Sequence, residues 1–125
     1  MNTPENFHYT KDHEWLKLEG NEAIIGITDY AQTELGDIIF AELPAVGAIL
    51  EKNAAFGTVE AVKAVSEVFM PVSGEVIAVN AEVTDKPEVI NQDPYGAGWM
   101  IRVRLTKPEE VAELMDAAAY TAFIQ

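Results

Sequence analysis

A run of alternating apolar residues around a single lysine constrains the fold of this chain more than any other feature. The run extends from Gly57 to Pro71, and Lys63 is its only cation. Apolar residues recur with period two on both sides of Lys63, and the phase of the alternation breaks near the lysine. Such a break is typical of two strands joined by a tight turn. The sequence therefore predicts a β-hairpin that presents Lys63 at its exposed tip.

Two similar segments flank this hairpin. Residues 47–54 and 74–81 both begin with glycine, continue with apolar residues and end with asparagine and alanine. Lys63 lies about midway between the end of the first copy and the start of the second. Glycine, asparagine and apolar β-formers are typical of strand-and-turn units. The repeat thus predicts a mainly β fold, a quasi-two-fold sandwich with Lys63 at its apex.

Further strands are expected on both sides of this central part. Residues 14–18 and 23–27 are expected to form two strands joined by a turn at residues 19–21. Residues 37–43 read as a strand with both faces covered, because they contain a continuous apolar run. Residues 99–105 alternate as a strand with Arg102 and Arg104 pointing outward.

Two helices are expected. Thr28 is a candidate N-cap for a short helix near residues 29–35, and Gly36 is suited to follow its last turn. A second, C-terminal helix is expected near residues 108–118, since Pro108 favours a first helical turn. Its apolar stripe is expected to pack on the core. A last element, residues 120–124, is expected to pack back through Phe123.

Length and composition exclude several classes of protein. With 125 residues the chain is expected to form one domain, residues 1–125. The absence of cysteine excludes disulfides, thiolate metal sites and a cysteine nucleophile. The net charge of −13 makes nucleic acid a poor partner and favours basic protein partners. No apolar run or leader-like start suggests a membrane or export role, so we expect a cytoplasmic protein, or a mitochondrial matrix protein already trimmed.

Motifs along nearly the whole chain resemble the H protein of the glycine cleavage system, a lipoylated carrier. They are Tyr9 with Asp12-His13-Glu14-Trp15, Gly26-Ile27-Thr28-Asp29-Tyr30-Ala31-Gln32, Leu35-Gly36-Asp37-Ile38, Glu42-Leu43-Pro44, the block from Gly57 to Val76, Asn91, Pro94-Tyr95-Gly96 and Gly98-Trp99-Met100-Ile101. The resemblance implies a barrel-sandwich hybrid of the biotinyl- and lipoyl-carrier kind. Glu60, three residues before Lys63, and Gly74, eleven residues after it, also resemble lipoyl-lysine sites, which implies that a ligase recognises them.

The same resemblance implies a function without catalysis by this chain. Lipoate would be attached by an amide to Lys63 by a lipoate ligase or a lipoyl/octanoyl transferase. The carrier would take the aminomethyl group of glycine from the glycine decarboxylase (P protein) to the aminomethyltransferase (T protein). Dihydrolipoamide dehydrogenase (L protein) would then reoxidise the dithiol. A mobile carrier of this kind is expected to be a monomer.

The resemblance also implies a surface cleft whose acidic groups hold the protonated amine of the loaded arm. The matching positions are Glu14 and Glu67, and Asp12 stands where the family often has a small polar residue. His13 could orient the segment from Asp12 to Glu14, but we interpret it as a partly buried polar residue. A metal site is not expected, because cysteine is absent and the acids are scattered.

The sequence is also compatible with other functions. A biotin carrier usually has methionine on both sides of its lysine, whereas Val62 and Ala64 flank Lys63. A 2-oxoacid dehydrogenase lipoyl domain usually has aspartate before its lysine. An H-like lipoyl relay for another system fits the same motifs. The last alternative is an acidic protein-interaction domain in which Lys63 stays unmodified.

Overall fold

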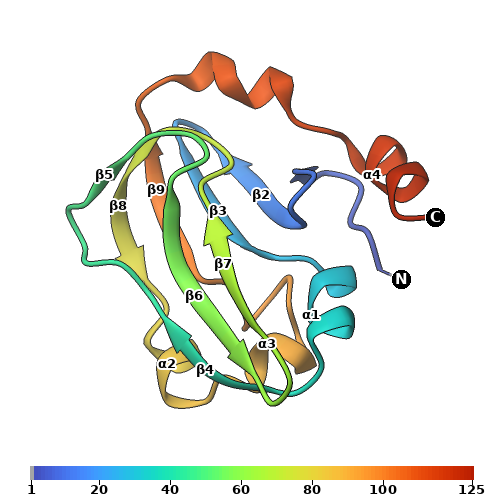
Figure 1. Ribbon diagram of the computed structural model, residues 1–125. Coiled ribbons are helices and arrows are strands. Elements are labelled where there is room, and N and C mark those ends of the chain that lie inside the picture. Colours follow the sequence, from blue (N-terminus) through green and yellow to red (C-terminus); the bar gives the residue numbers. More distant parts are fainter. Residues whose placement is uncertain (1) are drawn as a thin grey trace.

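The computed structural model describes residues 2–125, which form two antiparallel β-sheets and several short helices (Figure 1). The larger sheet has six strands in the order β1-β2-β3-β9-β8-β5, and the smaller has three in the order β4-β6-β7. The strands are β1 His8–Tyr9, β2 Glu14–Glu19, β3 Glu22–Ile27, β4 Ile38–Glu42, β5 Ile49–Leu50, β6 Ala55–Ala61, β7 Val65–Phe69, β8 Gly74–Val79 and β9 Ile101–Leu105. The helices are α1 Asp29–Leu35, α2 Ala81–Asp85, α3 Val89–Gln92, the 3₁₀ helix η1 Pro108–Glu113 and α4 Ala117–Phe123. The mainly β fold predicted from the sequence is confirmed.

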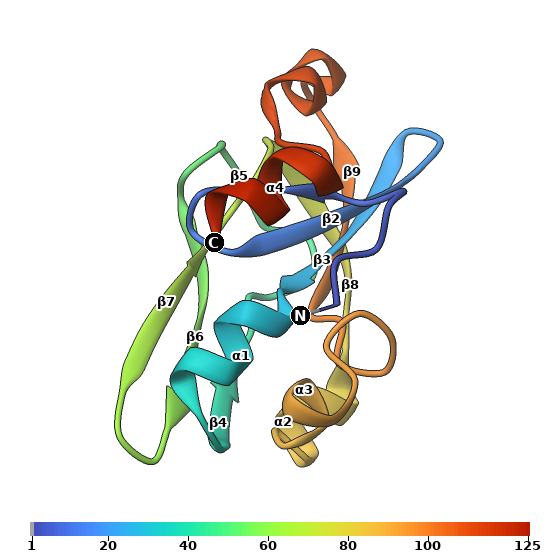
Figure 2. The same cartoon turned by 90° about the vertical axis from the view of Figure 1, so that its right-hand side faces the viewer.

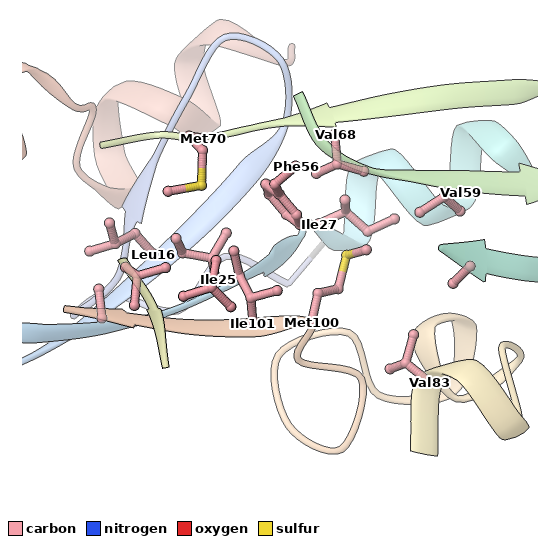
Figure 3. Close-up of a cluster of buried hydrophobic side chains, with 14 of the residues drawn as sticks. Leu16, Ile25, Ile27, Phe56, Val59, Val68, Met70, Val83, Met100 and Ile101 are labelled. Atoms are coloured by element: carbon pink, nitrogen blue, oxygen red, sulfur yellow. The ribbon is translucent and has the colours of Figure 1, made fainter. Parts of the chain in front are cut away.

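The core lies between the two sheets (Figure 3). Leu16 and Ile25 of the large sheet and Val59 and Val68 of the small one belong to this core, and all four are at most 2 % exposed. Inward side chains alternate with outward ones along β6 and β7, as expected for a sheet with one buried face. The start of β2 is buried on both faces, because Trp15 belongs to a second buried cluster with Tyr9 and Tyr120. The repeated segments are unequal in the structure, because the first yields only the two-residue strand β5. That strand pairs with the start of β8.

The helix predicted at residues 29–35 forms with both of its expected caps. The Thr28 hydroxyl accepts a hydrogen bond from the Ala31 backbone N–H, and Gly36 follows the last turn with φ of +82°. A residue with a side chain is strained at this φ, so glycine suits the position. Helices α2 and α3 fall in segments for which the sequence predicted no helix, and Figure 2 shows them beneath β8 and beside α1.

The expectation that both faces of the strand at residues 37–43 are covered is wrong. Ile39 is 56 % exposed and Phe40 is 49 % exposed, whereas Ile38 and Ala41 are buried. Strand β4 belongs to a three-stranded sheet that packs on the core through one face only. A β-bulge between Ile38 and Phe40 adds a residue that points outward.

The single C-terminal helix near residues 108–118 is also not what forms. The 3₁₀ helix η1 ends at Glu113, the chain extends, and α4 begins at Ala117. The break arises because Met115 exchanges two backbone hydrogen bonds with Tyr9, at 2.8 and 2.9 Å. Asp116 then caps α4 by accepting from the Ala119 N–H at 2.8 Å. Val111 and Leu114 pack on the core as expected.

The last element packs on the rest of the molecule through a different residue from the one predicted. Tyr120 is 1 % exposed and stacks on Tyr9 with ring centroids 4.6 Å apart, whereas Phe123 is 46 % exposed. A helix of seven residues presents only one side to the core, and in α4 that side carries Tyr120.

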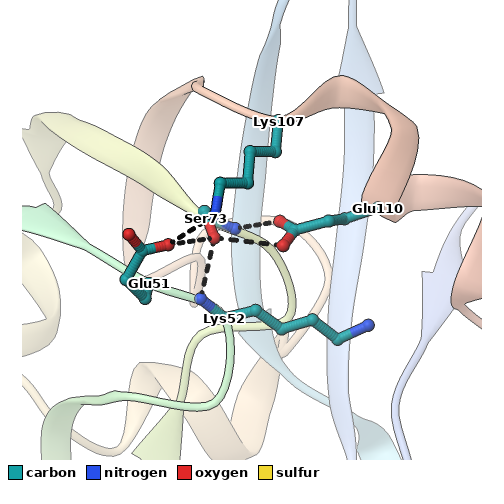
Figure 4. Close-up of polar contacts among 5 residues, drawn as sticks. All are labelled: Glu51, Lys52, Ser73, Lys107 and Glu110. Carbon is teal, nitrogen blue, oxygen red and sulfur yellow. Dashed lines mark hydrogen bonds and ion pairs between the residues drawn. The ribbon is translucent and has the colours of Figure 1, made fainter.

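A polar cluster centred on Ser73 holds η1 against the sheets (Figure 4). Glu110 accepts from the Ser73 backbone N–H at 2.6 Å, and Glu51 lies 2.9 Å from the Ser73 hydroxyl. The same hydroxyl accepts from the Lys52 N–H at 2.9 Å, and Lys107 pairs with Glu51 at 3.4 Å. Residues from three parts of the chain therefore meet at one buried serine.

Candidate functional site around Lys63

Lys63 lies in the two-residue turn that joins β6 to β7. The Ala61 N–H donates to the Ala64 carbonyl at 2.7 Å, so Val62 and Lys63 are the two residues of the loop. Both are exposed, and Val62 is 74 % exposed. The strands below the turn are paired from Ala55 to Phe69, which makes the tip a supported feature. The predicted hairpin with an exposed lysine is confirmed.

The tip of the hairpin rests on the end of α1 (Figure 2). The Val62 N–H donates to the Asp37 carbonyl at 3.2 Å. The Lys63 side chain passes over Gly36, where an added Cβ would lie 3.4 Å from the lysine Cε. Helix α1 has no basic residue in its last turn, so Lys63 brings a positive charge to its negative end from another element.

Asn91 fixes the junction between α1 and β4 that supports this contact. Its side-chain NH₂ donates to the Gln32 side chain at 2.9 Å and to the Gly36 carbonyl at 2.8 Å. Its carbonyl oxygen accepts from the Ile38 N–H at 2.9 Å. The sequence motifs included Asn91 but gave it no role, because these partners lie more than fifty residues away. Asn91 therefore holds together the junction of α1 and β4 on which the tip of the hairpin rests.

Two adjoining hollows lie along α1 and share Leu35. The first, about 300 Å³, is lined by Leu35, Gly36, Asp37, Val62 and Lys63. The second, also about 300 Å³, is lined by Asp12, His13, Tyr30, Ala31, Glu34, Leu35 and Ser66. We call the second hollow the acidic cleft, because Asp12 and Glu34 bring carboxylates to it. The pair of hollows offers a long acyl chain on Lys63 a surface along which to lie.

Glu14 lies apart from the acidic cleft and is buried, with 2 % exposure. One carboxylate oxygen accepts from the Thr10 hydroxyl at 2.5 Å, and the other from the Phe69 N–H of β7 at 3.2 Å. Burial raises the pKa of Glu14 to about 7, against the opposing effect of these two donors. In this conformation Glu14 joins the N-terminal segment to the hairpin.

The raised pKa of Glu14 predicts a specific pH dependence of stability. Below the unfolded pKa of about 4.5, where the Glu14 carboxyl is protonated, its contribution to the stability of the fold is fully present. This contribution is lost as pH rises through about 7. The loss is on the order of 3 kcal/mol. Glu14→Gln should remove this component, so the free energy of unfolding should fall less between pH 5 and pH 8. Urea titrations over this range measure it. The exposed Glu67→Gln is the control, and equal slopes for both variants would contradict the prediction.

Glu67 and Glu60 lie on the outer face of the small sheet. Glu67 pairs with Thr58, and Glu60 lies between Phe40 and Val65 in register. Ser66, not Glu67, lines the acidic cleft. The structure therefore does not bring Glu14 and Glu67 together, although both were predicted to contact the loaded arm. The cleft is lined instead by Glu34, which the sequence reasoning missed, and by Asp12.

Gly74, the second residue expected to guide a ligase, is buried at the start of β8. That end of β8 lies at the opposite end of the molecule from the tip of the hairpin (Figure 1). An added Cβ would lie 2.8 Å from the Arg104 carbonyl oxygen and 3.2 Å from the Val103 side chain. The close approach of β9 thus explains why glycine occupies position 74, whether or not a ligase recognises it.

Comparison with known proteins agrees with this geometry. The family described as Glycine cleavage H-protein matches residues 7–125. The chain belongs to the glycine cleavage H-protein family. A glycine cleavage system H protein of Salinibacter ruber is 56 % identical over 120 residues, covering 96 % of this chain and 97 % of the relative. One of Chlorobium limicola is 53 % identical, covering 99 % and 98 %.

A solved structure is also similar. The crystal structure of a glycine cleavage system H protein from Mycobacterium marinum superimposes with a TM-score of 0.88 at 38 % identity, covering 95 % of this chain and 96 % of that one. Proteins of this family are non-catalytic lipoyl carriers of the glycine cleavage system, and the fold is that of lipoyl carriers. Within residues 2–125 no helix is long and apolar enough to cross a membrane.

Proposed function

We propose that Lys63 carries lipoate through an amide bond and that this chain serves the glycine cleavage system as its mobile carrier. The observation that carries the proposal is the placement of an exposed lysine in a two-residue turn, supported by paired strands, in a member of this family. When attached, the lipoyl group would supply a disulfide whose S–S bond is reduced as one sulfur accepts the aminomethyl group left by decarboxylation of glycine. Release of that group leaves a dithiol, which would then be reoxidised. The chain itself contributes the exposed attachment point and the acidic cleft.

The partners proposed for this chain are those of its family. They are the P, T and L proteins, together with a lipoate ligase or lipoyl/octanoyl transferase that acts on Lys63. Glu60 lies three residues before Lys63 and is half-buried on the outer face of the small sheet, where a ligase can reach it. We propose that Glu60 contributes directly to ligase recognition and that Gly74 contributes through the fold. We further propose that residues 1–125 act as one monomeric carrier domain. The bacterial origin of the relatives supports the proposal that it works in the cytoplasm.

The acidic cleft is proposed to hold the protonated amine of the loaded arm. Asp12 and Glu34 both line it, and neither forms an ion pair within residues 2–125. Glu14 would contact the amine only after exchanging its bonds to Thr10 and Phe69. An exposed ion pair contributes little free energy, which suits a contact that must reopen at the next enzyme.

Removing the Asp12 carboxylate is therefore expected to weaken this hold. Asp12→Asn should speed loss of the amine from the loaded arm about two- to fivefold, equivalent to about 0.5–1 kcal/mol. The decay of the loaded species can be followed by intact mass at pH 7. Glu67→Gln is the matched control, because Glu67 lies on the outer face. A larger effect from Glu67→Gln than from Asp12→Asn would contradict the assignment of the cleft. Glu14→Ala is expected to leave lipoylation intact and to speed the loss through rearrangement of Glu14 toward the amine, and an unchanged rate would remove Glu14 from the site.

A direct test of the proposed function uses purified P protein, glycine and the lipoylated chain. Transfer of the aminomethyl group should add its mass to the chain, on the peptide that contains Lys63. An increment on a different peptide, or none with an active P protein and fully lipoylated chain, would overturn the proposal. In the second case a lipoyl relay for another system becomes the better description, because the chain is lipoylated but takes up no aminomethyl group.

A further inference from the structure

Two hydrogen-bonding atoms from other parts of the chain meet at the hydroxyl of Tyr120. Nδ1 of His13 lies 2.8 Å from it and Oγ1 of Thr28 lies 2.7 Å from it. Tyr120 belongs to α4, His13 immediately precedes β2, and Thr28 is the N-cap of α1. Tyr120 is 1 % exposed and Thr28 is fully buried, so water cannot readily replace these partners. The three side chains must therefore supply one another's hydrogen-bond donors and acceptors.

Counting the hydrogens gives the direction of each bond. Oγ1 of Thr28 already accepts from the Ala31 N–H at 3.2 Å, and its own buried hydrogen needs an acceptor. Within residues 2–125 the hydroxyl of Tyr120 is the acceptor in reach. Thr28 therefore donates to Tyr120, and Tyr120 donates its hydrogen to Nδ1 of His13. The reverse direction would leave the buried Thr28 hydrogen unpaired, which costs free energy.

We propose that Tyr120 is a positioning residue that holds His13 as the neutral tautomer protonated on Nε2, and so keeps the acidic cleft free of positive charge. This inference rests on the proposed function, in which the cleft receives a protonated amine. It gives the C-terminal helix, which lies outside the hairpin and both hollows, a role in the binding of the arm.

The surroundings of His13 fix its ring as well as its protonation. The ring contacts Tyr30 and Phe123 with centroids 4.6 and 5.9 Å apart. The backbone of His13 has φ of +69°, which is unfavourable for a residue with a side chain. Two backbone hydrogen bonds maintain it, one to the Thr10 carbonyl at 3.2 Å and one from the Thr28 N–H at 3.0 Å. A strained residue persists only where its surroundings determine it.

A neutral His13 matters because it shares the acidic cleft with two carboxylates. The charged groups that face it are Asp12 from its own loop and Glu34 from α1. The other elements packed around His13 bring uncharged groups to it, which are Ser66 of β7, Tyr30 of α1 and Tyr120 of α4. Burial lowers the pKa of His13, whereas Asp12 and Glu34 act in the opposite sense. An imidazolium here would pair with the same carboxylates and repel the amine, so its absence leaves the carboxylates available.

The primary test observes the His13 ring directly by ¹⁵N NMR in the unlipoylated protein. At pH 7.5 the wild type should show an unprotonated Nδ1 and a protonated Nε2. Tyr120→Phe keeps the stack on Tyr9 and removes only the hydroxyl, so it should yield a mixture of tautomers and a higher pKa for His13. His8 is an internal control whose signals should not move. Tyr30→Phe is the matched variant, since Tyr30 contacts the ring but, in the described part of the chain, forms no hydrogen bond to it.

The outcomes separate this inference from the proposed function. A wild-type His13 protonated on Nδ1 would overturn the inference. Because this measurement is made on the wild-type protein, it does not depend on whether a variant folds. Unchanged His13 signals in Tyr120→Phe would overturn it too. In the loaded, lipoylated protein, loss of the amine is expected to accelerate below a certain pH. Tyr120→Phe should raise that pH. An unmoved profile would refute the role in arm binding. Failure of Lys63 to be lipoylated would refute the proposed function alone, because the NMR result does not depend on lipoate.

Discussion

Replacing Lys63 with arginine is expected to abolish carriage in the glycine cleavage reaction while leaving the fold intact. Arginine keeps the charge and nearly the length of the side chain, but its guanidinium is not acylated by the ligase. Reconstituted cleavage with P, T and L proteins should fall to the level measured without carrier. The free energy of unfolding should change by no more than about 0.5 kcal/mol, because the side chain is exposed.

Lys11→Arg and Lys86→Arg are the controls for this result. Both lysines are exposed and, like Lys63, form no ion pair with the rest of residues 2–125. Each should retain full carrier activity. Cleavage sustained by the Lys63→Arg protein would refute the assignment of Lys63, and loss of cleavage in a control would point to a site elsewhere.

The second large effect is expected for Gly74→Ala. The added methyl group would lie 2.8 Å from the Arg104 carbonyl, a backbone atom that cannot move without disturbing the pairing of β8 with β9. Overpacking of this kind destabilises by about 1–3 kcal/mol. Denaturant titration should therefore show a lower midpoint with an unchanged slope.

The same variant separates the two reasons for a glycine at this position. If Gly74 acts through the fold, the fraction of Gly74→Ala protein that is folded should be lipoylated at the wild-type rate. An unchanged stability with slow lipoylation would instead mean that the ligase contacts Gly74 directly. Glu60→Gln, which alters an accessible residue three positions before Lys63, should slow lipoylation without a loss of stability.

Local patterns predicted the parts of this molecule that depend on near neighbours in the chain. The alternation around Lys63 gave the hairpin, and Thr28 with Gly36 gave α1 and its caps. Both depend on hydrogen bonds within a few residues. The bounds of the C-terminal helix were wrong because a long-range pairing of Met115 with Tyr9 interrupts it. Asp116 before three alanines is an N-cap signal that could have placed the start of α4.

The sequence predicted the lysine at the centre of the candidate site but not all of the residues that line the acidic cleft. Lys63 stood out because its surroundings in sequence are distinctive. Glu34 did not, because one carboxylate on a helix in a chain with 21 acidic residues carries no local signal. The burial of Glu14 and the meeting of His13, Thr28 and Tyr120 depend on how α4 returns to the sheet. No spacing along the chain encodes these contacts.

Peptide mass spectrometry, after incubation of the chain with lipoate, ATP and an active lipoate–protein ligase, decides whether Lys63 is the attachment site. We expect one lipoyl increment per chain, on the peptide that contains Lys63. An increment on another lysine, or none on a sample whose folding has been verified, would contradict it.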